Sequence, residues 1–191
     1  MKVKGEGEDM KKILGLVVSL TIISGVCAAV LAYVNEITEK PIKKTAHDAE
    51  LAAVKVVMPA GVEAVGSVDA TAYSGQMYYM GTDAKGEVIG YAAKGKDTHG
   101  YGGDIELMVG FMPDKKTVVC YKVLAAAETP GLGMKLKTPE FADQFAGKDG
   151  RALKVKKDGG EIEAITSATI TSRAVCKAIA DAQKKLVAEA K

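Results

Sequence analysis

Aromatic and metal-binding side chains are scarce in this chain. Its 191 residues include no Trp, three Phe and two His, and the histidines, His47 and His99, stand far apart. A surface that stacks nucleobases needs aromatic rings, and zinc or haem sites need clustered His or Cys ligands. The net charge is only +2, with acidic and basic residues interspersed. The sequence therefore supports neither nucleic-acid binding nor a metal site.

Cysteine is nearly as rare. Cys27 falls inside a long apolar run, which leaves Cys120 and Cys176 as the two that could pair. Cys120 follows two valines in a strand-like run, and Cys176 borders the apolar stripe of the last helix. Two free thiols are the simpler interpretation, and the sequence leaves a disulfide open.

The long hydrophobic run occupies residues 13–34, which carry no charge. As a helix with a rise of 1.5 Å per residue, this run spans about 33 Å, enough for a bilayer core of roughly 30 Å. A cleaved signal peptide, the alternative, has a shorter apolar region and a small-x-small site that this run lacks. Lys11 precedes the run, and the mild basic bias favours a cytoplasmic N-terminus (residues 1–12) and an exported domain (residues 35–191).

The exported part predicts a single small α+β domain. Residues 37–57 continue as an amphipathic helix that ends at a Pro-Ala-Gly turn. Apolar runs on both sides of short polar turns predict two hairpins of one antiparallel sheet. The runs of the first hairpin are residues 78–80 and 88–91, and those of the second are residues 105–111 and 117–124.

Further elements are expected after the sheet. Thr138 and Pro139 predict a short helix with a capping Thr and Pro at its first position. Residues 153–155 predict one more strand. From Ala174 onward, apolar residues recur at steps of three and four with lysines between them, which predicts a final amphipathic helix.

Hydroxyl side chains cluster just before that helix, in the run EAITSATITSR of residues 163–173. Ser and Thr favour helix starts because their oxygens accept hydrogen bonds from unpaired backbone N–H groups. Those N–H groups and the helix dipole also make a site for a phosphate. The local pattern alone is more typical of a plain N-cap, and an anion site beside reactive hydroxyls is the functional alternative.

This run resembles the flavinylation motif of two related FMN-binding domains, those of the G subunit of the Rnf electron-transport complex and the C subunit of the sodium-pumping NADH:quinone reductase. That motif is an acidic residue, two variable positions, Ser or Thr, usually Gly, and then Ala-Thr. The corresponding residues here are Glu163, Thr166, Ser167, Ala168 and Thr169. Glu163 stands where Asp is usual, and Ser167 stands where Gly is usual. In the family the Thr after Ala carries FMN through a phosphoester bond, so the resemblance points to Thr169.

Two upstream segments resemble loops of the same family. They are GYGG at residues 100–103 and ETPGLG at residues 128–133, in family order. Each alone is more typical of a surface turn, because Pro presets φ and Gly permits a positive φ. A glycine also lets the backbone approach a flat ligand. The resemblance implies contacts with the flavin ring from Glu128, Thr129, Gly131, Leu132, Gly133 and Tyr101.

The resemblance also implies the partners of the flavin phosphate. Thr166, Ser167 and Thr171 would bond it through hydroxyls or backbone N–H groups. Lys135 or Arg173 could balance charge on the phosphate or on reduced flavin, although a solvated surface role is about as frequent for each.

In the family, this subunit belongs to a membrane assembly that moves electrons between reduced ferredoxin and NAD and couples that flow to sodium or proton transport. The resemblance therefore implies an electron carrier with covalent FMN, matured by a flavin transferase and held among membrane lipid and other Rnf subunits. This chain has neither a cluster-binding cysteine set nor a dinucleotide fingerprint. We expect no complete catalytic activity from it alone.

Several alternatives remain open from the sequence. The chain could be the C subunit of a sodium-pumping NADH:quinone reductase, although its shorter length favours the Rnf subunit. It could instead be a membrane-anchored module that binds a phosphate-bearing ligand reversibly, without a redox role. It could also be a structural subunit without flavin.

Overall fold

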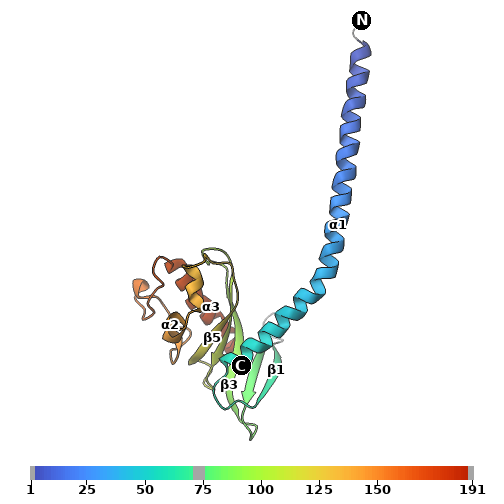
Figure 1. Cartoon of the computed structure of the whole chain (residues 1–191). Coiled ribbons are helices and arrows are strands. Elements are labelled where there is room, and N and C mark those ends of the chain that lie inside the picture. The colour runs from blue at the N-terminus through green and yellow to red at the C-terminus, as the bar shows by residue number, and fades with distance from the viewer. Residues whose placement is uncertain (1–2, 71–75, 189–191) are drawn as a thin grey trace. The chain divides into compact units, whose positions relative to one another are not determined.

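The computed structural model describes residues 3–70 and 76–188, with side chains for residues 12–39, 41–67 and 78–188. The side chain of Lys11, on which the expected orientation partly rests, lies outside this part of the chain. Two units divide the chain, Met1–His47 and Asp48–Lys191. The second unit contains all of the sheet and the remaining helices (Figure 1).

One continuous helix, α1 (Val3–Val57), contains the whole apolar run of residues 13–34. Among the described residues, it is the one helix long and apolar enough to cross a membrane. Its large apolar side chains between Ile13 and Ile37 are all exposed, and an apolar surface of this size needs a covering of lipid or protein. The expected helix is therefore present, with the length and composition of a membrane span. Residues 41–47 continue it with exposed side chains.

Five strands form an antiparallel sheet in sequential order, β1-β2-β3-β4-β5. Their bounds are β1 (Ala64–Ala70), β2 (Gln76–Thr82), β3 (Val88–Asp97), β4 (Ile105–Phe111) and β5 (Val118–Ala126). Both predicted hairpins are confirmed, β2 with β3 and β4 with β5. The sequence pattern does not predict β1, because its run AVGSVDA has small residues where a strand usually alternates bulky and polar ones.

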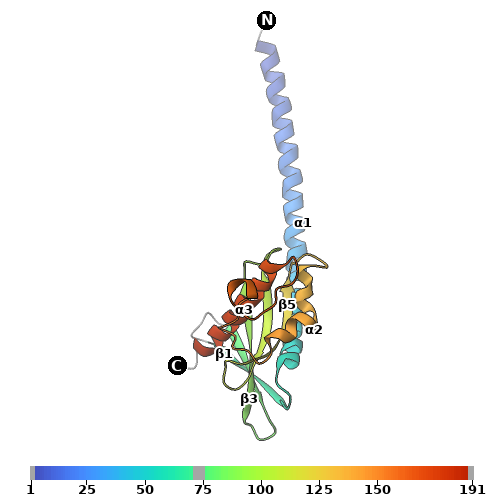
Figure 2. The ribbon, with the colours of Figure 1, turned by 90° about the vertical axis from the view of Figure 1, so that its left-hand side faces the viewer.

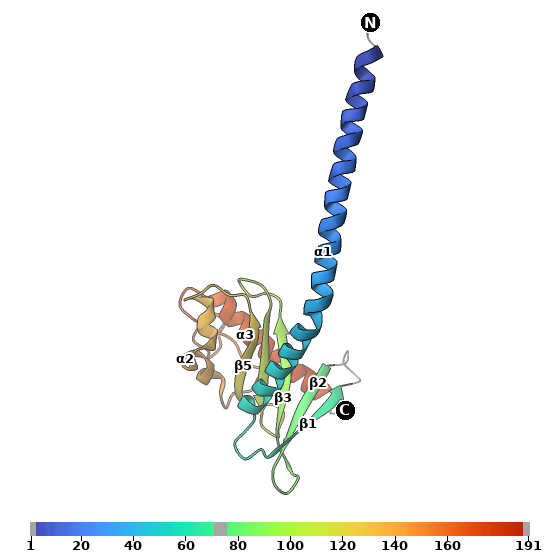
Figure 3. The same cartoon turned by 45° about the vertical axis from the view of Figure 1, so that its right-hand side comes forward.

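The two faces of the sheet carry separate cores. The final helix, α3 (Thr169–Ala188), lies on one face (Figure 2). Leu107 and Phe111 of β4 belong to the core beneath it. The end of α1 covers the opposite face, where Val54 and Val57 pack beside Met108 of β4 (Figure 3). Alternate residues of β4 thus serve different cores, as the two-residue period of a strand requires.

Two glycines let both helices approach the sheet closely. A Cβ at Gly95 of β3 would overlap the carbonyl oxygen of Ala178 in α3, and a Cβ at Gly110 of β4 would overlap that of Val57 in α1. Because backbone atoms cannot move aside as a flexible side chain can, any larger residue would push the helix away from the sheet.

The cysteines outside the apolar run are both free thiols. Cys120 lies beside the core under α1, whereas Cys176 belongs to the core under α3, on the other face of the sheet. Burial raises the pKa of the Cys176 thiol to about 12 and also raises that of Cys120. The pairing that the sequence left open therefore does not form.

Short helical turns connect β5 to α3. They are η1 (Gly133–Lys137), α2 (Pro139–Ala142), η2 (Asp143–Phe145) and η3 (Lys156–Asp158). The helix that begins at Pro139 is confirmed. The capping role of Thr138 is wrong, because its hydroxyl makes no cap and instead donates to the carbonyl oxygen of Lys135 at 2.8 Å.

The strand expected at residues 153–155 is also wrong. Leu153 and Val155 are buried, but Val155 forms only an isolated bridge with Ile162. Alternate apolar residues here anchor a loop to the core under α3, so the two-residue pattern reports burial and not strand pairing.

Candidate functional site

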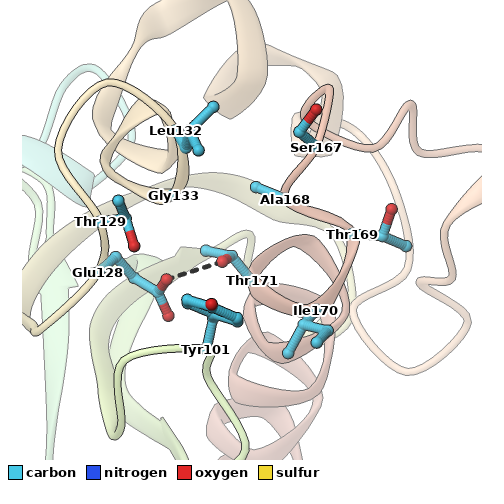
Figure 4. A pocket seen from close by; sticks show the side chains of 10 residues that line it. All are labelled: Tyr101, Glu128, Thr129, Leu132, Gly133, Ser167, Ala168, Thr169, Ile170 and Thr171. Carbon is cyan, nitrogen blue, oxygen red and sulfur yellow. Dashed lines mark hydrogen bonds between the residues drawn. The ribbon is translucent and has the colours of Figure 1, made fainter.

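A cavity of about 400 Å³ lies where the start of α3 meets the loops that follow β3 and β5 (Figure 4). Pockets for cofactors and drug-sized ligands are about 300–1,000 Å³ in size. Two groups of residues line the cavity. The helix wall consists of Ser167, Ala168, Thr169, Ile170 and Thr171, and the loop wall consists of Tyr101, Glu128, Thr129, Leu132 and Gly133. The fold therefore joins the three segments that the sequence singled out.

The helix wall begins with a tight turn. The Ala168 N–H donates to the Ile165 carbonyl oxygen at 2.9 Å, and Ser167 has a φ of 64°. A positive φ at the third residue of a turn is the type II pattern, which favours Gly because a side chain is strained there. Ser167 thus occupies a backbone position suited to the Gly that is usual in the motif.

The first turn of α3 leaves polar groups unused beside the cavity. Within the described parts of the chain, no acceptor pairs with the backbone N–H groups of Thr169, Ile170 and Thr171, as is normal for a helix start. The hydroxyl of Ser172 does not cap them, since it accepts from the Ile165 N–H and donates to the Ala168 carbonyl oxygen. The helix start therefore presents donors and the positive end of its dipole.

A lysine that the sequence did not single out lies beside Thr169. The Lys157 ammonium donates to the Thr169 hydroxyl oxygen across 3.4 Å. Lys157 belongs to η3, and the next residue, Asp158, accepts two hydrogen bonds from Arg173 of α3 at 2.7 and 2.6 Å. This bond from Arg173 holds the pKa of Asp158 below its usual range. The clamp ties η3 to α3 and keeps the Lys157 cation close to the threonine.

The loop wall is organised around a buried carboxylate. Glu128 is only 6% exposed. Its Oε2 accepts from the Thr171 hydroxyl at 2.8 Å (Figure 4). Its Oε1 accepts from the Gly102 N–H at 3.4 Å. Thr171 is fully buried, so its hydroxyl serves Glu128 and is not free to donate to a phosphate.

Glycines pack closely around this carboxylate. A Cβ at Gly100 would lie 2.7 Å from Oε1 of Glu128, and a Cβ at Gly133 would overlap its Oε2. Gly100 and Gly133 therefore leave room for the Glu128 side chain. Gly131 does not line the cavity, and its φ of 76° shapes the turn that carries Leu132 to the rim.

Apolar side chains surround the mouth of the cavity. Tyr101 is 70% exposed, Leu132 43% and Ile170 48%. In Figure 4, Leu132 lies above the Glu128–Thr171 hydrogen bond and Tyr101 lies below it. Exposed apolar groups on several sides of a cavity suit a flat, largely apolar ligand that would cover them.

Other residues proposed from the sequence lie elsewhere. Thr166 and Lys135 line a second cavity of about 260 Å³, together with Glu163. Glu163 accepts from the Lys156 ammonium at 2.8 Å, which lowers its pKa. Arg173 is engaged with Asp158. The two halves of the hydroxyl motif therefore face different cavities, and Lys157 is the cation that the structure places beside Thr169.

Comparisons with known proteins agree with this geometry. A family model described as an FMN-binding domain matches residues 100–184, which include every residue that lines the larger cavity. The G subunit of an ion-translocating oxidoreductase complex from Methanosarcina acetivorans is 34% identical, over 90% of this chain and 93% of its own length. The G subunit of the Na⁺-translocating ferredoxin:NAD⁺ oxidoreductase complex of Acetobacterium woodii is 32% identical, over 90% of each chain.

A solved structure shares the fold. The C subunit of the Na⁺-translocating NADH-quinone reductase from Parabacteroides distasonis matches with a TM-score of 0.50 and 20% identity, over 66% of this chain and 76% of its own. The sheet, its flanking helices and the cavity thus define an FMN-binding-domain protein. More specifically, the chain belongs to the family of G subunits of the ion-translocating Rnf oxidoreductase complexes.

Proposed function

We propose that this chain is the electron-transferring G subunit of a membrane ferredoxin:NAD oxidoreductase complex, and that it carries FMN through a phosphoester on Thr169. The FMN-binding domain match and the relatives from Rnf complexes support the general role. The observation that carries the attachment site is the setting of Thr169, whose hydroxyl meets the Lys157 ammonium at the start of α3 beside the cavity.

The helix wall suits a phosphoester. A phosphate joined to Thr169 keeps one negative charge, which the unpaired N–H groups of the first turn and the Lys157 cation can both stabilise. The Arg173–Asp158 clamp holds η3 in place for this purpose. Thr171 plays a different part, because its hydroxyl orients Glu128.

The attachment conserves atoms and electrons. A bond forms between the Thr169 hydroxyl oxygen and the flavin phosphorus, and the bond from that phosphorus to the leaving group of an activated flavin donor breaks. The hydroxyl proton passes to a base, and no electrons are transferred. We propose that a flavin transferase supplies the donor and the catalytic groups.

The loop wall would hold the isoalloxazine ring. Leu132 and Ile170 offer apolar contact at the mouth, and Tyr101 offers an aromatic face. The bound flavin would supply the capacity to accept and pass on electrons, while the protein fixes its position and surroundings. The ferredoxin and nicotinamide chemistry would belong to other subunits of the complex.

We further propose that α1 anchors the subunit in the membrane with its N-terminus in the cytoplasm and the domain outside. A covalent link suits such a domain, because a scarce cofactor would otherwise be lost by dissociation. Protease should digest the domain when it is added to cells that have a permeabilised outer envelope and an intact cytoplasmic membrane. Complete protection of the domain under these conditions would contradict this orientation.

Attachment to Thr169 is tested by denaturing the natively produced membrane protein and examining it for flavin fluorescence on a gel. The wild-type band should fluoresce and its intact mass should include one flavin mononucleotide group. Thr169→Ala should abolish both signals. The matched control is Thr138→Ala, which removes a hydroxyl that lies outside the motif and lines the second cavity, and it should keep both signals.

A Thr169→Ala chain that retains flavin after denaturation would show that another residue carries the group. Flavin that is present in the native protein and lost on denaturation would indicate reversible binding. A wild-type chain that never shows flavin would support the remaining alternative, a structural subunit without flavin.

A further inference from the structure

The Glu128 carboxyl group is hydrogen-bonded through both of its oxygens. Both of its oxygens act as acceptors, one from the Thr171 hydroxyl and the other from the Gly102 N–H. Acceptance at both oxygens suits a carboxylate. No ion pair among the described residues involves Glu128, although the side chain is almost fully buried. One hydroxyl and one amide at 3.4 Å satisfy its oxygens without cancelling its charge.

The carboxylate lies on the wall of the cavity that we assign to flavin. A cation lies at the other wall, where the Lys157 ammonium meets the Thr169 hydroxyl. The cavity thus has a negative side at Glu128 and a positive side at the start of α3. This polarity would orient a bound flavin with its phosphate at α3 and its ring beside Glu128.

We propose that Glu128 is the residue that sets the reduction potential of the flavin in this subunit, an inference that rests on the proposed function. Each electron that enters the ring brings negative charge next to a fixed negative charge. Because the site is partly desolvated, the repulsion is screened much less than it would be in water. Glu128 therefore makes reduction less favourable and keeps the flavin a stronger electron donor than the same cavity would without the charge.

The test compares midpoint potentials of flavin in the purified full chain, titrated with a one-electron reductant. Glu128→Gln keeps the size of the side chain and an acceptor for Thr171 but removes the charge. We expect the equilibrium constant for one-electron reduction to rise about tenfold, which corresponds to a shift of about 59 mV to more positive potential. Glu128→Asp retains the charge and should stay closer to wild type.

Glu87→Gln is the matched control for charge. Glu87 lies in the turn between β2 and β3, at the opposite end of the strands from the cavity, and the same loss of charge there should leave the potential unchanged. The inference is overturned if Glu128→Gln keeps the wild-type potential, or if Glu87→Gln shifts it equally.

Flavin content is measured first, by intact mass and by absorbance of the native protein. A wild-type chain without covalent flavin counts against the attachment on Thr169. The effect of Glu128 on the potential is then measured on reversibly bound FMN. If Glu128→Gln fails to fold, the wild-type chain is used alone. Its infrared difference spectrum between oxidised and reduced flavin should contain bands of an ionised carboxylate perturbed by reduction, and their absence overturns the inference.

Discussion

The helix wall and the loop wall enclose the same cavity but are built in opposite ways. Among the residues that the structure describes, nothing pairs with the first N–H groups of α3 on the helix wall, and the Thr169 hydroxyl has only a long contact to Lys157. On the loop wall the main polar group, Glu128, already has its hydrogen bonds and is enclosed by glycines. A surface that forms a bond needs unused groups, whereas a surface that holds a ring needs a fixed shape and a fixed charge.

The largest effect is expected from disrupting the shape of the loop wall. Gly102→Ala would place a Cβ onto the carbonyl oxygen of Ala127, the residue before Glu128. Backbone would have to shift, which costs about 3 kcal/mol, at the upper end of the usual range for overpacking. Chemical denaturation of the full chain in detergent should show this loss of stability, together with a loss of attached flavin.

Gly66→Ala is the control for this change. Gly66 lies in β1, has no neighbour near its virtual Cβ and does not require a positive φ. Its stability should stay within about 1 kcal/mol of wild type, because only the intrinsic difference between Gly and Ala remains. If both substitutions destabilise the chain equally, the effect of Gly102→Ala does not come from close packing beside Glu128.

A smaller effect is expected when the helix wall loses its cation. Lys157→Gln removes the ammonium beside Thr169 and should slow flavin attachment about threefold, in keeping with the modest free energy of an exposed charge interaction. Added salt should slow the wild-type reaction toward the rate of the variant. The time course of gel fluorescence with purified transferase measures both rates.

The neighbouring lysine provides the comparison for Lys157. Lys156 has the same charge and belongs to the same turn, but its ammonium contacts Glu163. Lys156→Gln should therefore attach flavin faster than Lys157→Gln. If Lys156→Gln attaches flavin more slowly than Lys157→Gln, the Lys157 ammonium does not assist attachment.

The smallest effect concerns the turn that opens the helix wall. Ser167→Gly should raise the free energy of unfolding by about 0.5–1 kcal/mol, because Gly adopts a φ of 64° without the strain of a side chain. Thermal unfolding of the full chain measures the change. Lys115→Gly should stabilise the chain for the same reason, because Lys115 has a φ of 58° in the β4–β5 turn. Its gain in stability should be smaller, since the substitution also removes the contact of the Lys115 ammonium with the Tyr91 ring. Destabilisation by Ser167→Gly would show that the Ser167 side chain has an interaction of its own.

Local patterns predicted much of the fold and of the helix wall. The hairpins follow from apolar runs around polar turns, and the hydroxyl run correctly marks the start of α3. Such features depend on neighbours in sequence. β1 is missed because it is held by pairing with β2 and not by its own composition.

Tertiary contacts account for what the sequence could not provide. Lys157 resembles the lysines around it, and only the clamp between Asp158 and Arg173 brings it to Thr169. Glu128 looks like an exposed loop residue, and its burial depends on glycines from two separate segments and on Thr171. No local signal distinguishes either residue, since the partners that define its role are distant in the chain.

The sequential order of the sheet has a consequence for biogenesis. Each strand pairs with the one before it, so the sheet can assemble as the polypeptide emerges, whereas the helix that bears Thr169 follows all five strands in the chain and docks onto β3 and β4. A polypeptide that ends before α3 would therefore lack one wall of the cavity and the Thr169 hydroxyl. If Thr169 carries the flavin as proposed, such a product would stay colourless, and the yellow colour would mark chains that include α3.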